Sequence, residues 1–191
     1  MKKILYILFA LWSPCGALAF DVAGRVVDVH DGDTLTVLVD RKEVKVRLEG
    51  IDAPELGQRY GNRSKRSLAD LCIGKHARVS EQNHGHHGRI LGVVLCGDVE
   101  ANSTQVLRGM AWVFDRYVAD GSPLYRLQDE AKSRQRGLWA DGQPVAPWEW
   151  RARSHAKAIE LKWRVAAVSD SNETARSRST SRPMLLASQR R

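Results

Sequence analysis

The sequence predicts a mainly β domain with added helices, an α+β fold of five short strands and three helices. Short runs rich in valine are separated by turn residues, as in small antiparallel sheets. One further run alternates strictly between apolar and charged residues, which is typical of a half-buried strand. Other stretches carry leucine and alanine at helical spacing, and 191 residues suffice for one domain with a sizeable core.

The first three strands follow from turn signals and β-branched residues. Residues 22–29 form a valine-rich run, Asp31-Gly32 is a strong turn signal, and residues 34–39 form the β-branched return strand. Residues 43–49 then alternate, with valine and leucine on one face and charged residues on the other. This alternation predicts a third antiparallel strand whose Arg47 faces away from the apolar side.

The second half of the chain adds helices and two more strands. Helices are predicted at residues 59–73 and 102–110, and a third begins at Ser122-Pro123 and ends before Gly137. We expect the first of these helices to bury four side chains: Tyr60, Leu68, Leu71 and Cys72. Strands are predicted near residues 76–82 and 89–96. Five strands in a meander, with a helix between the third and the fourth, are typical of an OB-type barrel.

The N-terminus has the pattern of a secretory signal peptide. Lys2-Lys3 precede an apolar stretch over residues 4–12, and Ala17-Leu18-Ala19 forms a small-residue cleavage site. We therefore expect residues 1–19 to be removed, leaving Phe20 first in an exported protein, periplasmic or secreted. The apolar stretch is too short for a membrane helix, so no stable anchor is expected after cleavage.

Positive charge is concentrated at the C-terminal end of the chain. The whole chain has a net charge of +8, yet residues 20–150 carry 18 Lys/Arg against 19 Asp/Glu. We assign residues 20–153 to the domain and residues 154–191 to a basic tail, with a short helix at 154–166 and disorder beyond it. The tail either attracts polyanions or is a dispensable extension. The domain itself is nearly neutral, so it must engage a polyanion with a few well-placed cations.

The cysteines give a candidate disulfide. If Cys15 leaves with the signal peptide, Cys72 and Cys96 remain as an even pair in an oxidising compartment. The alternative is two buried free thiols that behave as small hydrophobic residues.

Three carboxylates and two arginines form the candidate catalytic set. Asp33 begins one predicted strand and Asp52 follows the end of another, so adjacent strands can bring them together to bind a hard divalent cation. Glu55, across Pro54, can orient or deprotonate water, and the two arginines, Arg47 and Arg89, can stabilise charge on a phosphoryl group. The set suits phosphodiester cleavage, although an Asp-Gly-Asp turn by itself is usually only a turn.

The order and spacing of these motifs resemble the staphylococcal nuclease family. The resemblance covers about residues 22–153 and implies an OB barrel with three helices. The matching stretches are Val29-His30-Asp31-Gly32-Asp33-Thr34, Val46-Arg47-Leu48-Glu49-Gly50-Ile51-Asp52-Ala53-Pro54-Glu55, Gly88-Arg89, Leu107-Arg108-Gly109-Met110-Ala111-Trp112, Arg136-Gly137-Leu138-Trp139 and Pro147-Trp148-Glu149-Trp150-Arg151.

The resemblance implies a metal site. The side chains of Asp33 and Asp52 and the backbone carbonyl of Ala53 would bind one Ca²⁺ ion. The family archetype has threonine where this chain has Ala53, a change that a backbone ligand survives.

The resemblance also implies a reaction. Glu55 would act as general base toward the attacking water, while Arg47 and Arg89 would hold the scissile phosphate. The family cleaves DNA and RNA with calcium and leaves 3′-phosphate ends, and we expect a monomer with both nucleic acids as substrates.

Substrate contacts around the site depart from the family pattern. His87 stands where a tyrosine is expected near the bound nucleotide, Asp115 replaces another tyrosine, and Tyr117 matches a second nucleotide-contacting tyrosine. His84 and His86 lie beside His87, and this loop could bind a transition metal or simply touch substrate.

Two other functions remain open from the sequence. The domain could be a non-catalytic OB-type module that binds nucleic acid, although retention of the five candidate catalytic and metal residues argues against it. It could also be a metal-dependent phosphodiesterase that acts on small nucleotides.

Overall fold

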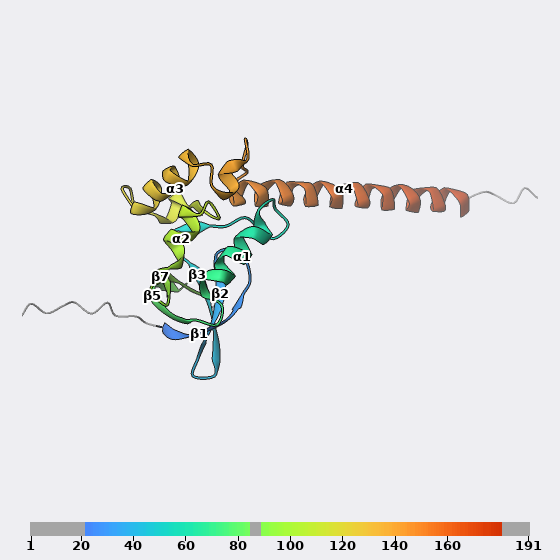
Figure 1. Cartoon of the computed structure of the whole chain (residues 1–191). Coiled ribbons are helices and arrows are strands. Elements are labelled where there is room, and N and C mark those ends of the chain that lie inside the picture. The colour runs from blue at the N-terminus through green and yellow to red at the C-terminus, as the bar shows by residue number, and fades with distance from the viewer. Residues whose placement is uncertain (1–21, 85–88, 181–191) are drawn as a thin grey trace, which may run out of the picture. The chain divides into compact units, whose positions relative to one another are not determined.

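The computed structural model of the chain describes residues 22–84 and 89–180 (Figure 1). The predicted signal peptide and two of the loop histidines, His86 and His87, lie outside these ranges. The chain divides into two compact units, one ending at Asp141 and one beginning at Gly142. Each unit is described by itself.

A closed barrel of five long strands forms the first unit, as the sequence predicts. These strands are β1 (Val22–Val29), β2 (Thr34–Val39), β3 (Lys42–Leu48), β5 (His76–His84) and β6 (Ile90–Cys96). They pair antiparallel in the order β3-β2-β1-β5-β6. A parallel pairing of β3 with β6 closes the barrel. The β2–β3 hairpin extends from the end of the barrel opposite α2 and α3 (Figure 1).

Three short strands complete the sheets and were not predicted. They are β4 (Ile51–Asp52), β7 (Val99–Glu100) and β8 (Trp112–Val113). β7 pairs with β6, and β4 pairs with β8 as a separate two-stranded sheet. A segment of two residues has no measurable periodicity, so the pattern that identifies long strands cannot find it.

The three predicted helices of this unit are present. They are α1 (Gly61–Cys72), α2 (Ala101–Leu107) and α3 (Pro123–Ser133), with 3₁₀ turns η2 (Asp115–Tyr117) and η3 (Gly137–Ala140). The Ser122 hydroxyl caps α3 by accepting the Leu124 N–H at 3.4 Å. The second helix ends at Leu107, earlier than the predicted 102–110, because Gly109 takes a left-handed φ of 65° that a helix cannot continue through. A side chain at Gly109 would also overlap the Arg136 carbonyl. In Figure 1, α2 lies between the barrel and α3.

Side chains from the barrel interior, α1 and α2 make one core. Its fully buried members include Val26, Leu35, Val37, Val46, Leu48, Leu68, Val79, Val94 and Val106. α1 buries the expected Leu68, Leu71 and Cys72 against this core. Tyr60 is only half-buried, because it precedes the helix with a left-handed φ of 68° instead of lying on its buried face.

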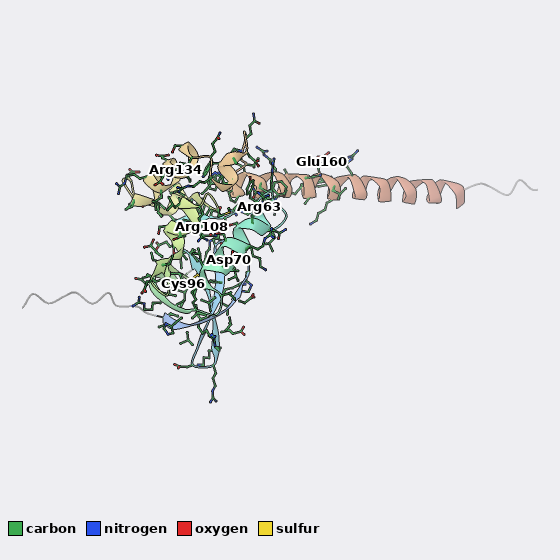
Figure 2. The ribbon with its side chains drawn as sticks, in the orientation of Figure 1. Arg63, Asp70, Cys96, Arg108, Arg134 and Glu160 are labelled. Carbon is green, nitrogen blue, oxygen red and sulfur yellow. A yellow bond between two sulfur atoms is a disulfide. The ribbon has the colours of Figure 1, made fainter. Side chains whose placement is uncertain are left out.

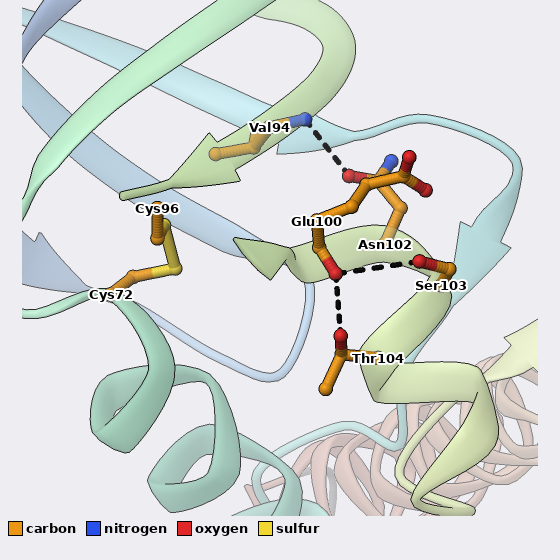
Figure 3. Close-up of a disulfide and its surroundings, with 7 residues drawn as sticks. All are labelled: Cys72, Val94, Cys96, Glu100, Asn102, Ser103 and Thr104. Atoms are coloured by element: carbon orange, nitrogen blue, oxygen red, sulfur yellow. Dashed lines mark hydrogen bonds between the residues drawn. A yellow bond between two sulfur atoms is a disulfide. The ribbon is translucent and has the colours of Figure 1, made fainter. Parts of the chain in front are cut away.

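A disulfide joins α1 to the barrel. Cys72 ends α1, Cys96 ends β6 (Figure 2), and their Cα atoms lie 5.1 Å apart. Beside the disulfide, the Asn102 side chain accepts the Val94 N–H at 3.0 Å (Figure 3). The same amide donates to the Glu49 carbonyl at 2.9 Å, so α2 holds both β6 and the chain that follows β3.

The second unit is dominated by α4 (Pro147–Thr180), which is longer than the sequence suggested. We expected a short helix over 154–166 and disorder beyond it. No glycine or proline occurs between Trp148 and Arg182, so no strong helix breaker lies within the segment. Of the helices that the structure describes, none combines the length and apolar character needed to span a membrane.

Candidate functional site

Arg47 is the centre of the candidate site. Its Nη1 lies 2.8 Å from Asp33 Oδ1, and its Nη2 lies 2.8 Å from Asp52 Oδ1. The two carboxylate side chains are only 3% and 1% exposed, whereas the Arg47 side chain is 24% exposed. One guanidinium therefore joins two buried acids and still reaches the surface, an arrangement that its planar set of donors makes possible.

The β1–β2 turn fixes the position of Asp33. The His30 N–H donates to the Thr34 carbonyl at 2.8 Å, and the Asp33 N–H donates to the Asp31 carboxylate at 3.0 Å. β2 and β3 pair with Thr34 opposite Arg47. Because Asp33 immediately precedes Thr34, the hairpin brings its carboxylate to the arginine.

A buried amide holds this turn against the helices. Gln105 on α2 is fully buried, and its Nε2 donates to the Gly32 carbonyl at 2.7 Å and to the Ser64 carbonyl at 3.2 Å. The Ser64 hydroxyl donates to the Met110 carbonyl at 2.6 Å. A side chain at Gly32 would overlap Ser64 and Ala53, so only glycine allows α1 to approach the turn this closely.

Asp33 is held by further hydrogen bonds and has a perturbed pKa. Its Oδ2 accepts the Ala53 N–H at 2.7 Å, and its Oδ1 accepts the Thr34 hydroxyl at 2.9 Å. Burial raises the pKa of Asp33 to about 7, because the attraction of Arg47 only partly offsets the loss of water. For Arg47, burial lowers the pKa, but Asp33 and Asp52 outweigh it and raise the pKa above its usual range.

The donor set fits a hard divalent cation. Asp33 and Asp52 together carry more negative charge than Arg47 neutralises, and carboxylate oxygens are the ligands that Ca²⁺ prefers. Within residues 22–84 and 89–180, no three His, Cys, Asp or Glu side chains gather closely enough to bind an ion by themselves. An ion here would therefore need backbone carbonyls or water as further ligands. Ala53, the predicted backbone ligand, is buried directly beside Asp33.

Glu55 belongs to the turn that leads from β4 into α1. Its N–H donates to the Gln58 side chain at 3.2 Å, and its carbonyl accepts the Gln58 N–H at 2.8 Å. Gly61, the first residue of α1, packs so closely on the Glu55 carbonyl that a side chain there would overlap it. The backbone of this half-buried acid is thus fixed to the helix.

Arg89 lies on the same face of the barrel as Arg47. In the parallel β3–β6 pairing, Val46 is opposite Ile90 and Arg47 is opposite Leu91. Paired residues share a face, and residues two apart on an extended chain also share a face. Arg89 immediately precedes β6, and continuing this register places the half-buried residue opposite Lys45, two residues from Arg47 on the same face.

The predicted substrate-contacting residues have different outcomes. Tyr117 lies in η2 with 56% of its surface exposed, and its ring centroid is 5.1 Å from that of Phe114. An exposed ring of this kind can stack on a base. His87 lies outside the described residues.

Sequence reasoning missed the polar residues that support the site. Asn102 and Gln105 are buried three positions apart on α2, and the first holds the chain after β3 while the second holds the Asp31–Asp33 turn. The sequence does show two amide residues three positions apart, a spacing that places both side chains on one face of a helix. Nothing in that spacing identifies which backbone groups they contact.

Comparison with known proteins identifies the family. The family model described as "Staphylococcal nuclease homologue" matches residues 45–141, a range that includes Arg47, Asp52, Glu55 and Arg89. The chain belongs to the staphylococcal nuclease family. A family relative of Escherichia coli, named an uncharacterized endonuclease, is 44% identical over 153 residues, which cover 80% of this chain and 98% of the relative.

Further relatives carry similar names. A protein of Shigella flexneri named micrococcal nuclease is 40% identical over 147 residues, covering 70% of this chain and 83% of its own length. A protein of Haemophilus influenzae, named an uncharacterized endonuclease, is 42% identical over 129 residues, covering 66% of this chain and 71% of its own. The family model thus ends where the first unit ends, and these relatives match 66–80% of this staphylococcal nuclease family member.

Proposed function

We propose that the protein is a calcium-dependent endonuclease that hydrolyses DNA and RNA with little sequence specificity and leaves 3′-phosphate ends. The main support is the pairing of one partly exposed arginine, Arg47, with two buried carboxylates, Asp33 and Asp52. Membership of the staphylococcal nuclease family and relatives named endonuclease or micrococcal nuclease support the same reaction.

Asp33, Asp52 and the Ala53 carbonyl would hold one Ca²⁺ ion. When bound, the ion would polarise a phosphoryl oxygen and make a bound water more acidic. Glu55 would accept the proton of the attacking water, which requires a carboxylate that is held in place without being a metal ligand. Two hydrogen bonds with Gln58, within the turn that precedes α1, hold its backbone.

Arg47 and Arg89 would bind the scissile phosphate. A guanidinium has five N–H donors, and two hydrogen bonds to the carboxylates leave Arg47 with donors for a phosphate at its exposed edge. Arg89 lies on the same face of the sheet and would supply a second cation. Together they would stabilise the charge that develops on the phosphoryl oxygens.

The decisive experiment incubates the protein with single-stranded DNA and with RNA, in calcium or in a chelator. Calcium-dependent cleavage is expected, and the product ends should resist extension by a polymerase until a phosphatase removes the 3′-phosphate. Binding in calcium without any cleavage would instead support a non-catalytic OB-type module. Cleavage confined to dinucleotides would support a phosphodiesterase for small nucleotides.

We further propose that the protein is exported after removal of residues 1–19 and acts as a monomer. The supporting observation is the charged, apolar and small-residue order of the N-terminus. N-terminal sequencing of protein recovered from the periplasm or medium should begin at Phe20. Light scattering on the same material should give the mass of one chain.

A further inference from the structure

A groove lined by arginines lies on the first unit, formed by α1 and the chain that follows α2 and α3. We call it the arginine groove; it has a volume of about 590 Å³, and its charged lining residues are Arg63, Arg66, Asp70, Arg108 and Arg136. Figure 2 shows Arg63 and Asp70 on α1 with Arg108 beside them. An adjoining hollow of about 300 Å³ shares two of these arginines and extends the surface toward Arg59 and Tyr60.

The groove concentrates cations on a domain that has no net positive charge. Residues 59–75 carry five Lys/Arg and one Asp, whereas residues 20–150 as a whole carry 18 Lys/Arg and 19 Asp/Glu. Arg59 belongs to the turn before α1 and pairs with Asp141 at 2.8 Å. On α1 itself, Arg63 and Arg66 are three residues apart, so they lie on one face of the helix. This spacing separates them from the buried face of the same helix.

Three of the groove arginines have no acidic partner among the residues that the structure describes. Arg136 pairs with Glu130 at 3.3 Å, but none of the ion pairs within the described part of the chain includes Arg63, Arg66 or Arg108. Their recorded contacts are with neutral groups: Arg108 donates to the Ser67 hydroxyl at 3.2 Å, and the Arg63 guanidinium lies 5.0 Å from the centre of the Tyr60 ring. Uncompensated guanidinium groups in a groove are suited to phosphate oxygens.

The groove begins close to the candidate active site. Gln58 lines the adjoining hollow and also exchanges hydrogen bonds with Glu55, and Ser64 on α1 packs against the turn before Asp33. From Arg63 to Asp70, two groove residues within α1, the helix rises about 10 Å, which corresponds to about three nucleotides of one strand. The adjoining hollow thus borders the turn that carries Glu55, and α1 leads from it along the groove.

We propose that the arginine groove is a second phosphate-binding surface, which holds the sugar-phosphate backbone of a nucleic acid strand next to the site of cleavage. The proposal rests on the proposed nuclease function and specifies how that site takes long substrates. Contacts to the backbone carry no sequence information, so the groove raises the affinity for any strand long enough to reach it. Its contribution weakens as salt concentration rises.

The test compares a double variant, Arg63→Gln with Arg66→Gln, with a control, Arg41→Gln with Lys42→Gln. Both variants remove two exposed charges from the first unit, but the control residues lie at the β2–β3 hairpin, outside the groove. Binding of single-stranded DNA of roughly 16 nucleotides is measured in a chelator over a range of salt concentrations. Cleavage of the same strand and of a strand of about 4 nucleotides is measured in calcium.

The groove variant should bind the long strand about 4- to 25-fold more weakly than wild type. Each of the two lost arginine–phosphate contacts should lower the affinity about two- to fivefold, as for other pairs of exposed charges. The slope of log affinity against log salt should fall by about 1.4, from a loss of about 0.7 per phosphate contact on a single strand. Cleavage of the short strand should stay unchanged, and the control should match wild type. An unchanged affinity and salt slope in the groove variant would overturn the proposal.

A second variant guards against misfolding. Asp70→Asn removes the one acid of the groove and should raise the affinity for the long strand about twofold or more, a gain that a damaged fold cannot produce. Unchanged or weaker binding by Asp70→Asn contradicts the proposal. If wild type cleaves no substrate in calcium, the proposed function fails, whereas wild-type cleavage with no effect of the groove variants refutes the groove alone.

Discussion

Replacing Arg47 by methionine tests whether the site is built around two charges buried on one guanidinium. The substitution keeps much of the side-chain length but removes the hydrogen bonds of Asp33 and Asp52 to the guanidinium, both 2.8 Å long. The carboxylates are only 3% and 1% exposed, so water cannot replace the lost partner without a rearrangement. Removing one partner of a buried ion pair costs about 3–5 kcal/mol.

We expect Arg47→Met to lower the free energy of unfolding by about 3–5 kcal/mol in the presence of a chelator, as measured by urea denaturation. A matched control is Lys45→Met, because Lys45 is exposed two residues earlier on β3. Substitution of such a surface residue should change the stability by no more than about 0.5 kcal/mol.

Calcium should partly compensate for the lost arginine. A ligand that binds only the folded state at a hundred times its Kd adds about 2.7 kcal/mol. The calcium-dependent gain should be larger in Arg47→Met than in wild type, because the ion would supply the positive charge that the two carboxylates have lost. A loss below about 1 kcal/mol in chelator, or no extra gain with calcium, would refute the reasoning.

Further predictions concern catalysis, the disulfide and the turn that carries Asp33. Glu55→Gln should lower kcat by about 10²–10⁴-fold while the urea midpoint stays unchanged; normal turnover would exclude Glu55 as the base. Replacing Cys72 and Cys96 together by serine should lower the free energy of unfolding by about 3.5 kcal/mol, given their separation of 24 residues, and unfolded, unreduced wild-type protein should show no free thiol from this pair. Gly32→Ala should cost about 1–3 kcal/mol and weaken calcium binding measured by calorimetry, since it displaces the turn. Gln105→Leu should cost about 1–3 kcal/mol, because the Gly32 carbonyl loses its donor, and an unchanged stability would mean that water replaces the amide.

The long strands could be predicted because their residues repeat a local pattern. The runs at residues 22–29 and 34–39 coincide with β1 and β2, and the alternation near Arg47 places that residue off the apolar face, where the structure has it. The closing pairing of β3 with β6 could not be predicted in this way, because register between strands far apart in sequence leaves no local pattern.

The residue types of the candidate site were predictable from motifs, but their contacts were not. Nothing in the sequence indicates that Arg47 binds both Asp33 and Asp52, since that follows from the hairpin register and the short strand β4. The C-terminal expectation relied on composition, and the serine- and arginine-rich segment is helical to Thr180. Low apolar content predicts weak packing, yet it does not by itself prevent a helix.

Barrel closure also has a kinetic consequence. The β1–β2–β3 hairpins form from neighbouring residues and can join Arg47 to Asp33 early, because their loops are short. Arg89 reaches the same face only when β6 docks in parallel on β3, a distant contact of the kind that slows folding. An incomplete chain that ends before β6 thus has the acids and one arginine but no second cation. For the proposed nuclease, the complete set of candidate catalytic residues therefore depends on this distant pairing.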